Sequence, residues 1–424
     1  MGSELPNYEQ AAAKVSAYAR KLRQQIAPPR ELVALSRANG RVLAIPLIAD
    51  QDQPPFARST RDGYACRAAE ISRHKPLPVA GSTHAGQSPP TPLPEAAVWE
   101  IMTGAPVPEG ADAVVMLEHV EKSGKTIRLL PPRTIDVGDN IVAQAAQARR
   151  GEQLLPSGAT LGFAQIALAA SCGRATLEVS VRPRVAILTT GDELVPVEST
   201  PGPGQIRNSN ASMLAELVAN AGGEPVVLPT AADTPQALDK ALAKSLKADM
   251  LLISGGVSAG KFDLVEPALA RLRARFLFTG VRIQPGKPLV FGDLPRTASS
   301  ASDKGVKRLP FFGLPGNPIS SAVTFLLFGA PVMTALAGSP EPRPRFMLAH
   351  LGRDTDRHGK PGLTRFLPAL CDFNASGGRA PLVETVPWRG SGDLSAFARS
   401  NCFLMVPEDA GFLDAGSTVR VLLF

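Results

Sequence analysis

The sequence predicts a multidomain protein that combines an α/β domain with β domains. Its 424 residues exceed the usual size of one domain, about 100–200 residues. Between residues 181 and 338, strand-like and helix-like segments alternate, which predicts a central α/β domain with a mostly parallel sheet. Short alternating apolar runs between Gly and Pro residues predict a small, mostly β domain over residues 52–137 and a C-terminal, β-barrel-like domain over residues 339–424. Residues 1–51 and 138–180 form a discontinuous linking region of helical and β segments.

Composition narrows the classes of function. Hydrophobic residues make up 44% of the chain, enough for substantial cores. The net charge of +7 suits an anionic ligand, but the basic residues are scattered and aromatic residues make up only 5%, which disfavours nucleic-acid binding. The four cysteines form no C-x-x-C pair, so no zinc or redox motif is visible. The first residues lack a signal-peptide pattern, and no run approaches the ~20 apolar residues of a membrane span. We therefore expect a cytoplasmic protein that does not contact a membrane.

Periodicity and breaker residues define the first elements. Residues 7–26 are predicted to form a helix, because apolar residues recur at three- and four-residue steps until Pro28 and Pro29 stop it. Residues 53–65 form a polar, proline-led segment. Within it, the pair Asp62-Gly63 by itself favours an ordinary hairpin turn.

Strands and helices alternate through the α/β region. Strands are predicted at residues 185–188, 226–228 and 251–253, and near residues 276, 289 and 311. Helices are predicted over residues 160–172, 209–220, 235–246, 264–272 and 318–336. Ligands in parallel sheets bind at the carboxyl ends of the strands. Three motifs are predicted to lie at such ends: Gly191-Asp-Glu, Ser254-Gly-Gly and Pro315-Gly-Asn-Pro.

The turn after the third predicted strand organises the rest of the chain. Ser254, Gly255 and Gly256 follow a buried apolar run, and backbone N–H groups in such a turn can approach an anion closely. Asp263 follows at the predicted start of a helix, where an acid beside a phosphate can hold Mg2+. The alternative is that the glycines only tighten a strand-to-helix turn and that Asp263 caps the helix. The turn alone does not separate these two interpretations.

Seven short motifs occur in a recognisable order. They are Ser59-Thr-Arg-Asp-Gly-Tyr-Ala65, Met102-Thr-Gly-Ala-Pro-Val-Pro-Glu-Gly-Ala-Asp112, Thr190-Gly-Asp-Glu-Leu194, Ser254-Gly-Gly-Val-Ser258, Pro285-Gly-Lys-Pro288, Gly313-Leu-Pro-Gly-Asn-Pro-Ile-Ser320 and Gly390-Ser-Gly-Asp-Leu394. From about Tyr8 to its C-terminus, the chain resembles the molybdopterin molybdenumtransferases. These are the bacterial molybdenum-insertion enzymes, which are similar to the C-terminal domain of gephyrin.

The resemblance implies both a reaction and an assembly. Adenylylated molybdopterin and molybdate would give molybdenum cofactor and AMP, with Mg2+ as the cofactor. The α/β domain would bind the pterin nucleotide, and a homodimer formed through the linking region would complete the active-site cleft. The substrate would be handed over by a molybdopterin adenylyltransferase, and the product would pass to molybdoenzymes.

The resemblance also assigns roles to individual residues. It gives catalytic roles to Asp62, Thr103, Glu193, Asp263 and Lys287. Among these, Glu193 and Asp263 would hold the metal, and Lys287 would lie on the molybdate side. Substrate-binding roles fall to Gly191, Asp192, Asp233, Ser254, Gly255, Gly256, Pro315, Gly316, Asn317, Pro318 and Ser391. For Asp233, a place in the ordinary helix start formed with Thr234 and Pro235 is an equal alternative.

Several positions depart from the family pattern. Arg61 stands where Met is typical, and Gln284 replaces a frequent Lys. After Gly138-Asp-Asn-Ile141, the usual Gly and second acid are missing. The segment Gly362-Leu-Thr-Arg-Phe-Leu-Pro368 lacks two family arginines, although Arg365 and Arg389 lie nearby. The departures therefore concern the molybdate side rather than the nucleotide side.

Two other functions remain as alternatives. A molybdopterin adenylyltransferase would share the α/β fold and the Gly-Gly turn, but the β domains and the Pro315-Gly-Asn-Pro motif argue against it. A non-catalytic pterin-binding scaffold is suggested by the missing arginines.

Overall fold

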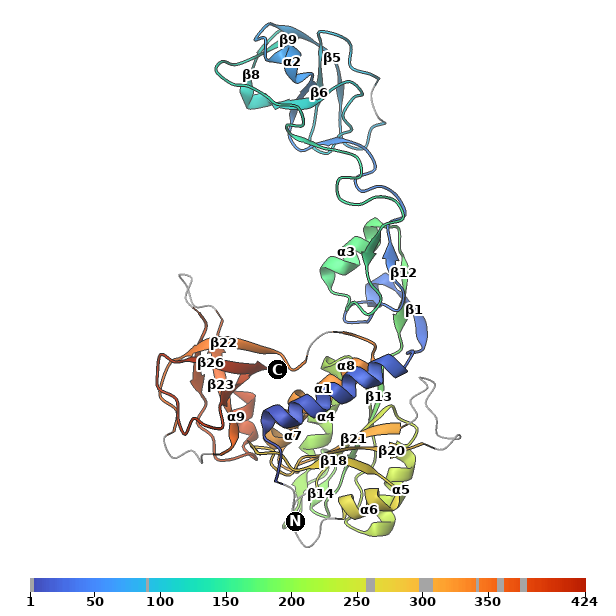
Figure 1. Ribbon diagram of the computed structural model, residues 1–424, viewed down its shortest axis with the longest axis vertical. Coiled ribbons are helices and arrows are strands. Elements are labelled where there is room, and N and C mark those ends of the chain that lie inside the picture. The colour runs from blue at the N-terminus through green and yellow to red at the C-terminus, as the bar shows by residue number, and fades with distance from the viewer. Residues whose placement is uncertain are drawn as a thin grey trace. The chain divides into compact units, whose positions relative to one another are not determined.

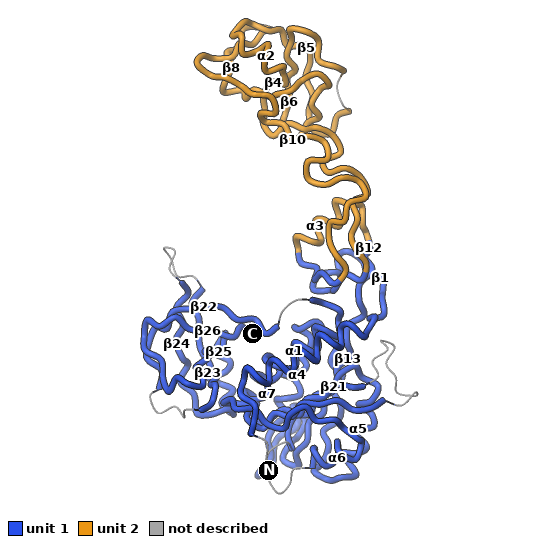
Figure 2. The backbone as a smooth tube through the Cα atoms, viewed as in Figure 1, with its two compact units in different colours: residues 1–44, 158–162, 176–424 blue, residues 45–157, 163–175 orange. Residues whose placement is uncertain are grey.

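The computed structural model divides into two compact units. It describes residues 4–88, 91–256, 264–296, 308–340, 343–356, 362–373 and 380–424. Figure 2 shows the first unit, residues 1–44, 158–162 and 176–424, and the second unit, residues 45–157 and 163–175. The chain thus enters and leaves the second unit more than once.

The second unit is built around a six-stranded mixed sheet. Its strand order is β7-β4-β6-β5-β9-β8, and only the β5–β6 pairing is parallel. The strands are β4 (Gly63–Cys66), β5 (Leu77–Thr83), β6 (Val98–Ile101), β7 (Ala113–Met116), β8 (Val120–Ser123) and β9 (Thr126–Leu129). Smaller elements are β2 (Leu47–Ile48), β3 (Arg58–Ser59), β10 (Ile141–Val142), β11 (Gln153–Leu155), α2 (Ala68–Ile71), α3 (Phe163–Ser171) and a 3-10 turn at Leu117–His119.

The first unit contains a second six-stranded sheet, which is mostly parallel as predicted. Its order is β16-β13-β17-β21-β20-β18, with parallel pairings as far as β21 and antiparallel pairings after it. The strands are β13 (Arg184–Thr189), β16 (Glu224–Val227), β17 (Met250–Ser254), β18 (Arg275–Thr279), β20 (Val290–Pro295) and β21 (Arg308–Leu314). Outside this sheet, β1 (Arg30–Ala34) pairs with β12 (Thr176–Ser180), and β14 (Leu194–Val195) pairs with β15 (Ile206–Arg207).

Helices cover both faces of this sheet because its strands are apolar on both sides. Val185 and Ile187 of β13 belong to one buried cluster, whereas Ala186 and Leu188 belong to the other. The first cluster includes residues of α1 (Tyr8–Gln25), α4 (Ser209–Asn220), α7 (Pro318–Thr324) and α8 (Ala330–Leu336). The second includes residues of α5 (Pro235–Ser245) and α6 (Val265–Arg271). In Figure 1, α5 and α6 lie apart from α1, α4 and α8.

The caps explain where the helices begin. Asn7 accepts a hydrogen bond from the Gln10 N–H, and the Gln10 side chain accepts one from the Asn7 N–H, which forms a capping box for α1. Thr234 caps α5 through the Ala237 N–H, with Pro235 in the first turn. The predicted bounds of these helices therefore agree with the observed ones to within two residues.

The last segment of the chain forms a closed five-stranded barrel, as the barrel-like prediction requires. The ring β23-β24-β22-β26-β25 closes because β25 pairs with both β26 and β23. Its members are β22 (Phe346–Leu351), β23 (Thr364–Asp372), β24 (Leu382–Thr385), β25 (Cys402–Val406) and β26 (Thr418–Leu423). Strand β19 (Ile283–Gln284), which comes from the α/β segment, pairs with β23. The short helix α9 (Leu394–Ala398) and a 3-10 turn at Leu35–Arg37 complete the first unit.

One helical run is more apolar than the sequence analysis allowed. Within the described residues, Pro318–Leu336 is the one helix long and apolar enough to cross a membrane, but 89% of its apolar window lies buried inside the fold. Core helices of soluble proteins pass the same test, so this length is weak evidence for a membrane span. The run is α-helical except for a π-helical stretch at Phe325–Gly329. Pro331, which has no N–H to donate, follows this stretch and accounts for the local change in hydrogen bonding.

Candidate functional site

The three predicted ligand motifs meet at one edge of the mostly parallel sheet. Strands β13, β17 and β21 are adjacent and parallel, and each ends at the first residue of one of the motifs or within two residues before it. The Thr190 N–H donates to Ser254 O at 3.0 Å, and the Gly255 N–H donates to Leu314 O at 3.2 Å. The carboxyl edge of the sheet therefore brings residues 190–193, 254–256 and 315–317 together.

The Ser254-Gly-Gly turn presses closely on the neighbouring strand. Gly255 has a φ of +99°, and a Cβ at this position would lie 2.5 Å from Thr190 O, so no other residue fits without strain. The Gly255 N–H donates to Leu314 O, so this N–H is already used within the fold. Asp263, predicted as a metal-binding catalytic acid, lies outside the described residues.

Three acidic side chains gather beside this turn. A Cβ on Gly191 would lie 2.5 Å from Glu193 Oε2, so the Glu193 carboxylate folds back over the glycine. Asp192 Oδ1 accepts a hydrogen bond from the Asp233 N–H at 3.0 Å. Packing around the Asp233 carboxyl raises its pKa, and the charges of Asp192 and Glu193 raise that pKa further. Because Thr234 is the cap of α5, Asp233 has no capping role.

The carboxylate oxygens of Asp192, Glu193 and Asp233 are suitable ligand atoms for a cation. Carboxylate oxygens are the ligands that Mg2+ prefers, and Mg2+ commonly uses one or two carboxylates together with substrate phosphates. Burial is the main cause of the raised pKa of Asp233, and repulsion from Asp192 and Glu193 adds to it; a bound cation would relieve that repulsion. Within the described residues, no group of three or more His, Cys, Asp or Glu side chains is arranged to hold a metal by itself.

The loop after β21 connects the sheet to the barrel. Asn317 Nδ2 donates to Ser391 Oγ at 2.9 Å, and the Ile319 N–H donates to Ser391 O at 3.0 Å. Asn317 precedes α7 without capping it through its side chain. The Ser321 hydroxyl donates to Pro315 O and lies 3.4 Å from Ser254 Oγ. The structure thus joins the predicted residues Ser254, Pro315, Asn317 and Ser391 into one region.

Lys287 faces a cleft of about 600 Å3 that borders this loop. Pro315, Asn317 and Ser391 also line the cleft. Leu363, which occupies the position of one missing family arginine, lines it with an apolar side chain. Arg365 is 4% exposed and donates to Gly411 O at 2.5 Å, so it is held in the barrel rather than in the cleft lining.

Asn210 is a residue of this site that sequence reasoning missed. Its Nδ2 donates to Ser254 Oγ at 2.9 Å and to Gly316 O at 2.6 Å, so it bridges two of the three loops. Its Oδ1 is buried without a hydrogen-bond partner in the described structure. The sequence signal was ambiguous because Asn208 and Asn210 both stand at the start of a helix. Asn208 is the actual cap, through the Ala211 N–H.

Asp62 and Thr103 form a separate pair within the second unit. Asp62 Oδ1 accepts hydrogen bonds from the Thr103 N–H and the Thr103 hydroxyl, both at 2.7 Å. These bonds hold the pKa of the Asp62 carboxyl below its usual value. Both residues are exposed. The predicted hairpin turn at Asp62-Gly63 is instead the point where β4 begins.

The fold and site define a class of protein. It is a multidomain protein with an α/β domain and a β-barrel, in which the Ser254-Gly-Gly turn, a group of acidic side chains and a cleft lined by Lys287 lie at the carboxyl edge of the parallel strands. Residues 7–173 match the MoeA N-terminal region (domain I and II), residues 186–335 match a probable molybdopterin-binding domain, and residues 339–424 match the MoeA C-terminal region (domain IV). The chain belongs to the molybdopterin molybdenumtransferase family.

Individual relatives agree with this assignment over nearly the whole chain. The molybdopterin molybdenumtransferase of Nostoc sp. is 34% identical over 404 residues, covering 92% of this chain and 88% of the relative. That of Bacillus subtilis is 35% identical over 405 residues, covering 93% and 89%. A solved molybdopterin biosynthesis moeA protein from Pyrococcus horikoshii matches with a TM-score of 0.78 and 28% identity, covering 99% of this chain and 100% of that structure.

Proposed function

We propose that this transferase inserts molybdate into adenylylated molybdopterin and thereby releases AMP and molybdenum cofactor. One observation carries the proposal. The loop of residues 315–317 borders both the Ser254-Gly-Gly turn and the Lys287 cleft, and Asn317 of this loop is hydrogen-bonded to Ser391. Such an arrangement can bind a nucleotide-linked pterin on one side and an oxyanion on the other. Family membership supports the same reaction.

The nucleotide side uses backbone and acidic groups. The Ser254-Gly-Gly turn lets a phosphate approach the chain closely, and Asn210 keeps this turn in register with Gly316. Mg2+, held by Glu193 with Asp192 or Asp233, would neutralise phosphate charge as the phosphoanhydride is cleaved. Asp263 remains a further candidate ligand on the strength of the resemblance.

The molybdate side depends on Lys287. Its ammonium supplies a positive charge for the oxyanion, while the Asn317 amide and the Ser391 hydroxyl can donate hydrogen bonds. Pro285 and Pro288 flank the lysine and restrict the backbone that carries it. These residues keep the oxyanion beside the pterin nucleotide.

We extend the proposal to assembly, partners and compartment. A homodimer would supply Asp62 and Thr103 to the active site of the partner subunit. The substrate would come from a molybdopterin adenylyltransferase, and the product would pass to molybdoenzymes. All four cysteines are free and buried, which suits a reducing cytoplasm.

The decisive experiment measures AMP released from adenylylated molybdopterin, with and without molybdate and Mg2+. The proposal requires AMP release that depends on molybdate. Binding of the pterin without such release would favour the scaffold function. Formation of pyrophosphate from ATP and molybdopterin would instead identify an adenylyltransferase.

A further inference from the structure

A second pocket, of about 400 Å3, lies at the opposite edge of the same sheet. Its lining includes Arg41, Arg182, Arg343 and Arg345, and it includes no Asp or Glu among the described residues. Helices α4 and α8 end at this pocket. The pocket lies near the first residues of β13 and β16, where Arg184 and Glu224 are partners in the sheet. The candidate active site lies where those strands end. The arginine pocket is therefore a distinct site.

The arginines of this pocket are not needed to terminate the two helices. The Gly222 and Gly223 N–H groups donate to the carbonyls of Ala219 and Val218 at the end of α4. At the end of α8, the N–H groups of residues 338 and 339 donate to the carbonyls of residues 335 and 334. Both patterns are complete Schellman motifs, in which backbone N–H groups satisfy two of the last four carbonyls of each helix.

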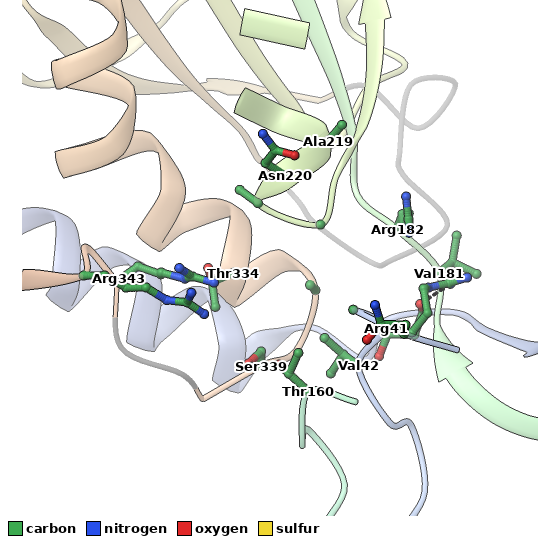
Figure 3. A pocket seen from close by; sticks show the side chains of 17 residues that line it. Arg41, Val42, Thr160, Val181, Arg182, Ala219, Asn220, Thr334, Ser339 and Arg343 are labelled. Carbon is green, nitrogen blue, oxygen red and sulfur yellow. Dashed lines mark hydrogen bonds between the residues drawn. The ribbon is translucent and has the colours of Figure 1, made fainter. Parts of the chain in front are cut away.

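The pocket has a rigid floor. The Arg41 guanidinium is buried, pairs with Glu31 and donates to Ser180 O at 2.8 Å. The hydroxyl groups of Thr160 and Ser339, which also line the pocket, lie 3.4 Å apart. Figure 3 shows Arg343 entering from the side opposite Arg41 and Arg182, so the positive side chains come from separate segments of the chain.

We propose that this pocket binds a phosphate-type divalent oxyanion, either free or as the phosphate of a small molecule. Guanidinium groups recognise such oxyanions through paired N–H donors and carry a permanent charge. A volume of about 400 Å3 exceeds what one phosphate needs and falls in the range of small-molecule pockets. The site does not depend on the proposed molybdate insertion.

The test follows the melting temperature of the full chain as inorganic phosphate replaces chloride at constant ionic strength. Saturable stabilisation is expected for the wild-type protein, because a ligand that binds only the folded state raises its stability. Arg182→Ala and Arg343→Ala should each weaken apparent phosphate affinity roughly tenfold or more, as expected for losing a charge-assisted hydrogen bond. Two variants are used so that a folding defect in one leaves the other informative.

Two control variants separate this site from other anion effects. Arg184→Ala removes an exposed arginine at the same edge, paired with Glu224 at 3.7 Å and outside the pocket lining, and should keep the wild-type response. Lys287→Ala removes the cation of the molybdate cleft and should also keep it. Equal phosphate responses in all four variants, or no saturable response in the wild type, would overturn the proposal. Repeating the titration with glycerol 3-phosphate identifies the ligand class: tighter binding indicates a phosphorylated metabolite, and weaker binding indicates free phosphate.

Discussion

Lys287 carries the positive charge of the cleft that we propose for molybdate. Among the described residues that line this cleft, it is the one cationic side chain. Gln284 and Leu363, which occupy positions where the family has cations, line the cleft without charge. In the proposed function, the oxyanion would therefore depend on this lysine.

We expect Lys287→Ala to raise the molybdate concentration for half-maximal AMP release roughly ten- to a hundredfold. The physical reason is the loss of a charge-assisted contact, which costs about 1.5–3 kcal/mol. Lys287→Arg, which keeps the charge, is the matched control, and affinity for the adenylylated pterin should change little in either variant. An unaltered molybdate dependence in Lys287→Ala would transfer the role to Arg389, since Arg365 is bonded within the barrel.

We expect the charged Asp233 side chain, which belongs to the acidic group, to lower the stability of the folded protein. Its pKa is raised in the folded state, so folding disfavours the charged form. This penalty is absent below the ordinary pKa of Asp. It grows as pH rises toward the raised pKa of the folded state and is complete above that pKa. Asp233→Asn should therefore have a higher Tm than wild type at neutral pH, and the difference should vanish in acid. Mg2+ should stabilise the wild type more than the variant, and identical Mg2+ responses would remove Asp233 from the metal site.

At the scale of elements, helix α4 begins with two asparagines that have different roles. Asn208 caps the helix and also donates to Thr189 Oγ1 at 2.8 Å. Asn210 instead reaches across to the loops after β17 and β21. At the start of this one helix, Asn208 thus contributes to stability, whereas Asn210 contributes to the site.

We expect Asn210→Ala to raise the KM for adenylylated molybdopterin roughly five- to thirtyfold, because two hydrogen bonds of about 1 kcal/mol each are lost. Asn208→Ala, the matched control, should lower Tm more, because loss of an N-cap costs about 0.5–2 kcal/mol. Asn210→Asp keeps the shape but removes the donor, and should not restore KM. Equal losses of Tm and equal KM values in the two alanine variants would show that Asn210 is only structural.

The elements that could be predicted were those with local signals. The helix at residues 209–220 was predicted with its observed bounds, since a Gly pair at residues 222–223 closes it. The carboxyl-edge position of the three motifs also followed from alternating strands and helices. The pairing of β19 with β23 could not be predicted, because a two-residue strand has no pattern and its partner lies about 80 residues away in the chain. Asn210 was missed for a similar reason: its partners are defined by the fold rather than by its neighbours in sequence.

At the scale of the whole molecule, we expect a homodimer whose subunits share catalytic residues. The resemblance assigns Asp62 to the partner's active site, while Glu193 belongs to the acidic group of its own subunit. Inactive Asp62→Asn and Glu193→Gln proteins, unfolded together and refolded as a mixture, should therefore regain part of the activity. Each variant treated alone provides the control. A monomer by light scattering at assay concentration, or an inactive mixture that contains dimers, would contradict shared sites.

The first helix has a consequence for how the protein is made. Tyr8 lies edge-on to Phe328, Phe346 and Phe366, with ring centroids 5.6–6.5 Å away. The ribosome therefore releases the apolar face of α1 long before its partners, which are more than 300 residues later in the chain. Throughout synthesis this face is exposed to wrong partners, including other nascent chains. Early protection of one amphipathic helix by a chaperone, or rapid synthesis of the downstream segments that cover it, would then govern the yield of the folded protein.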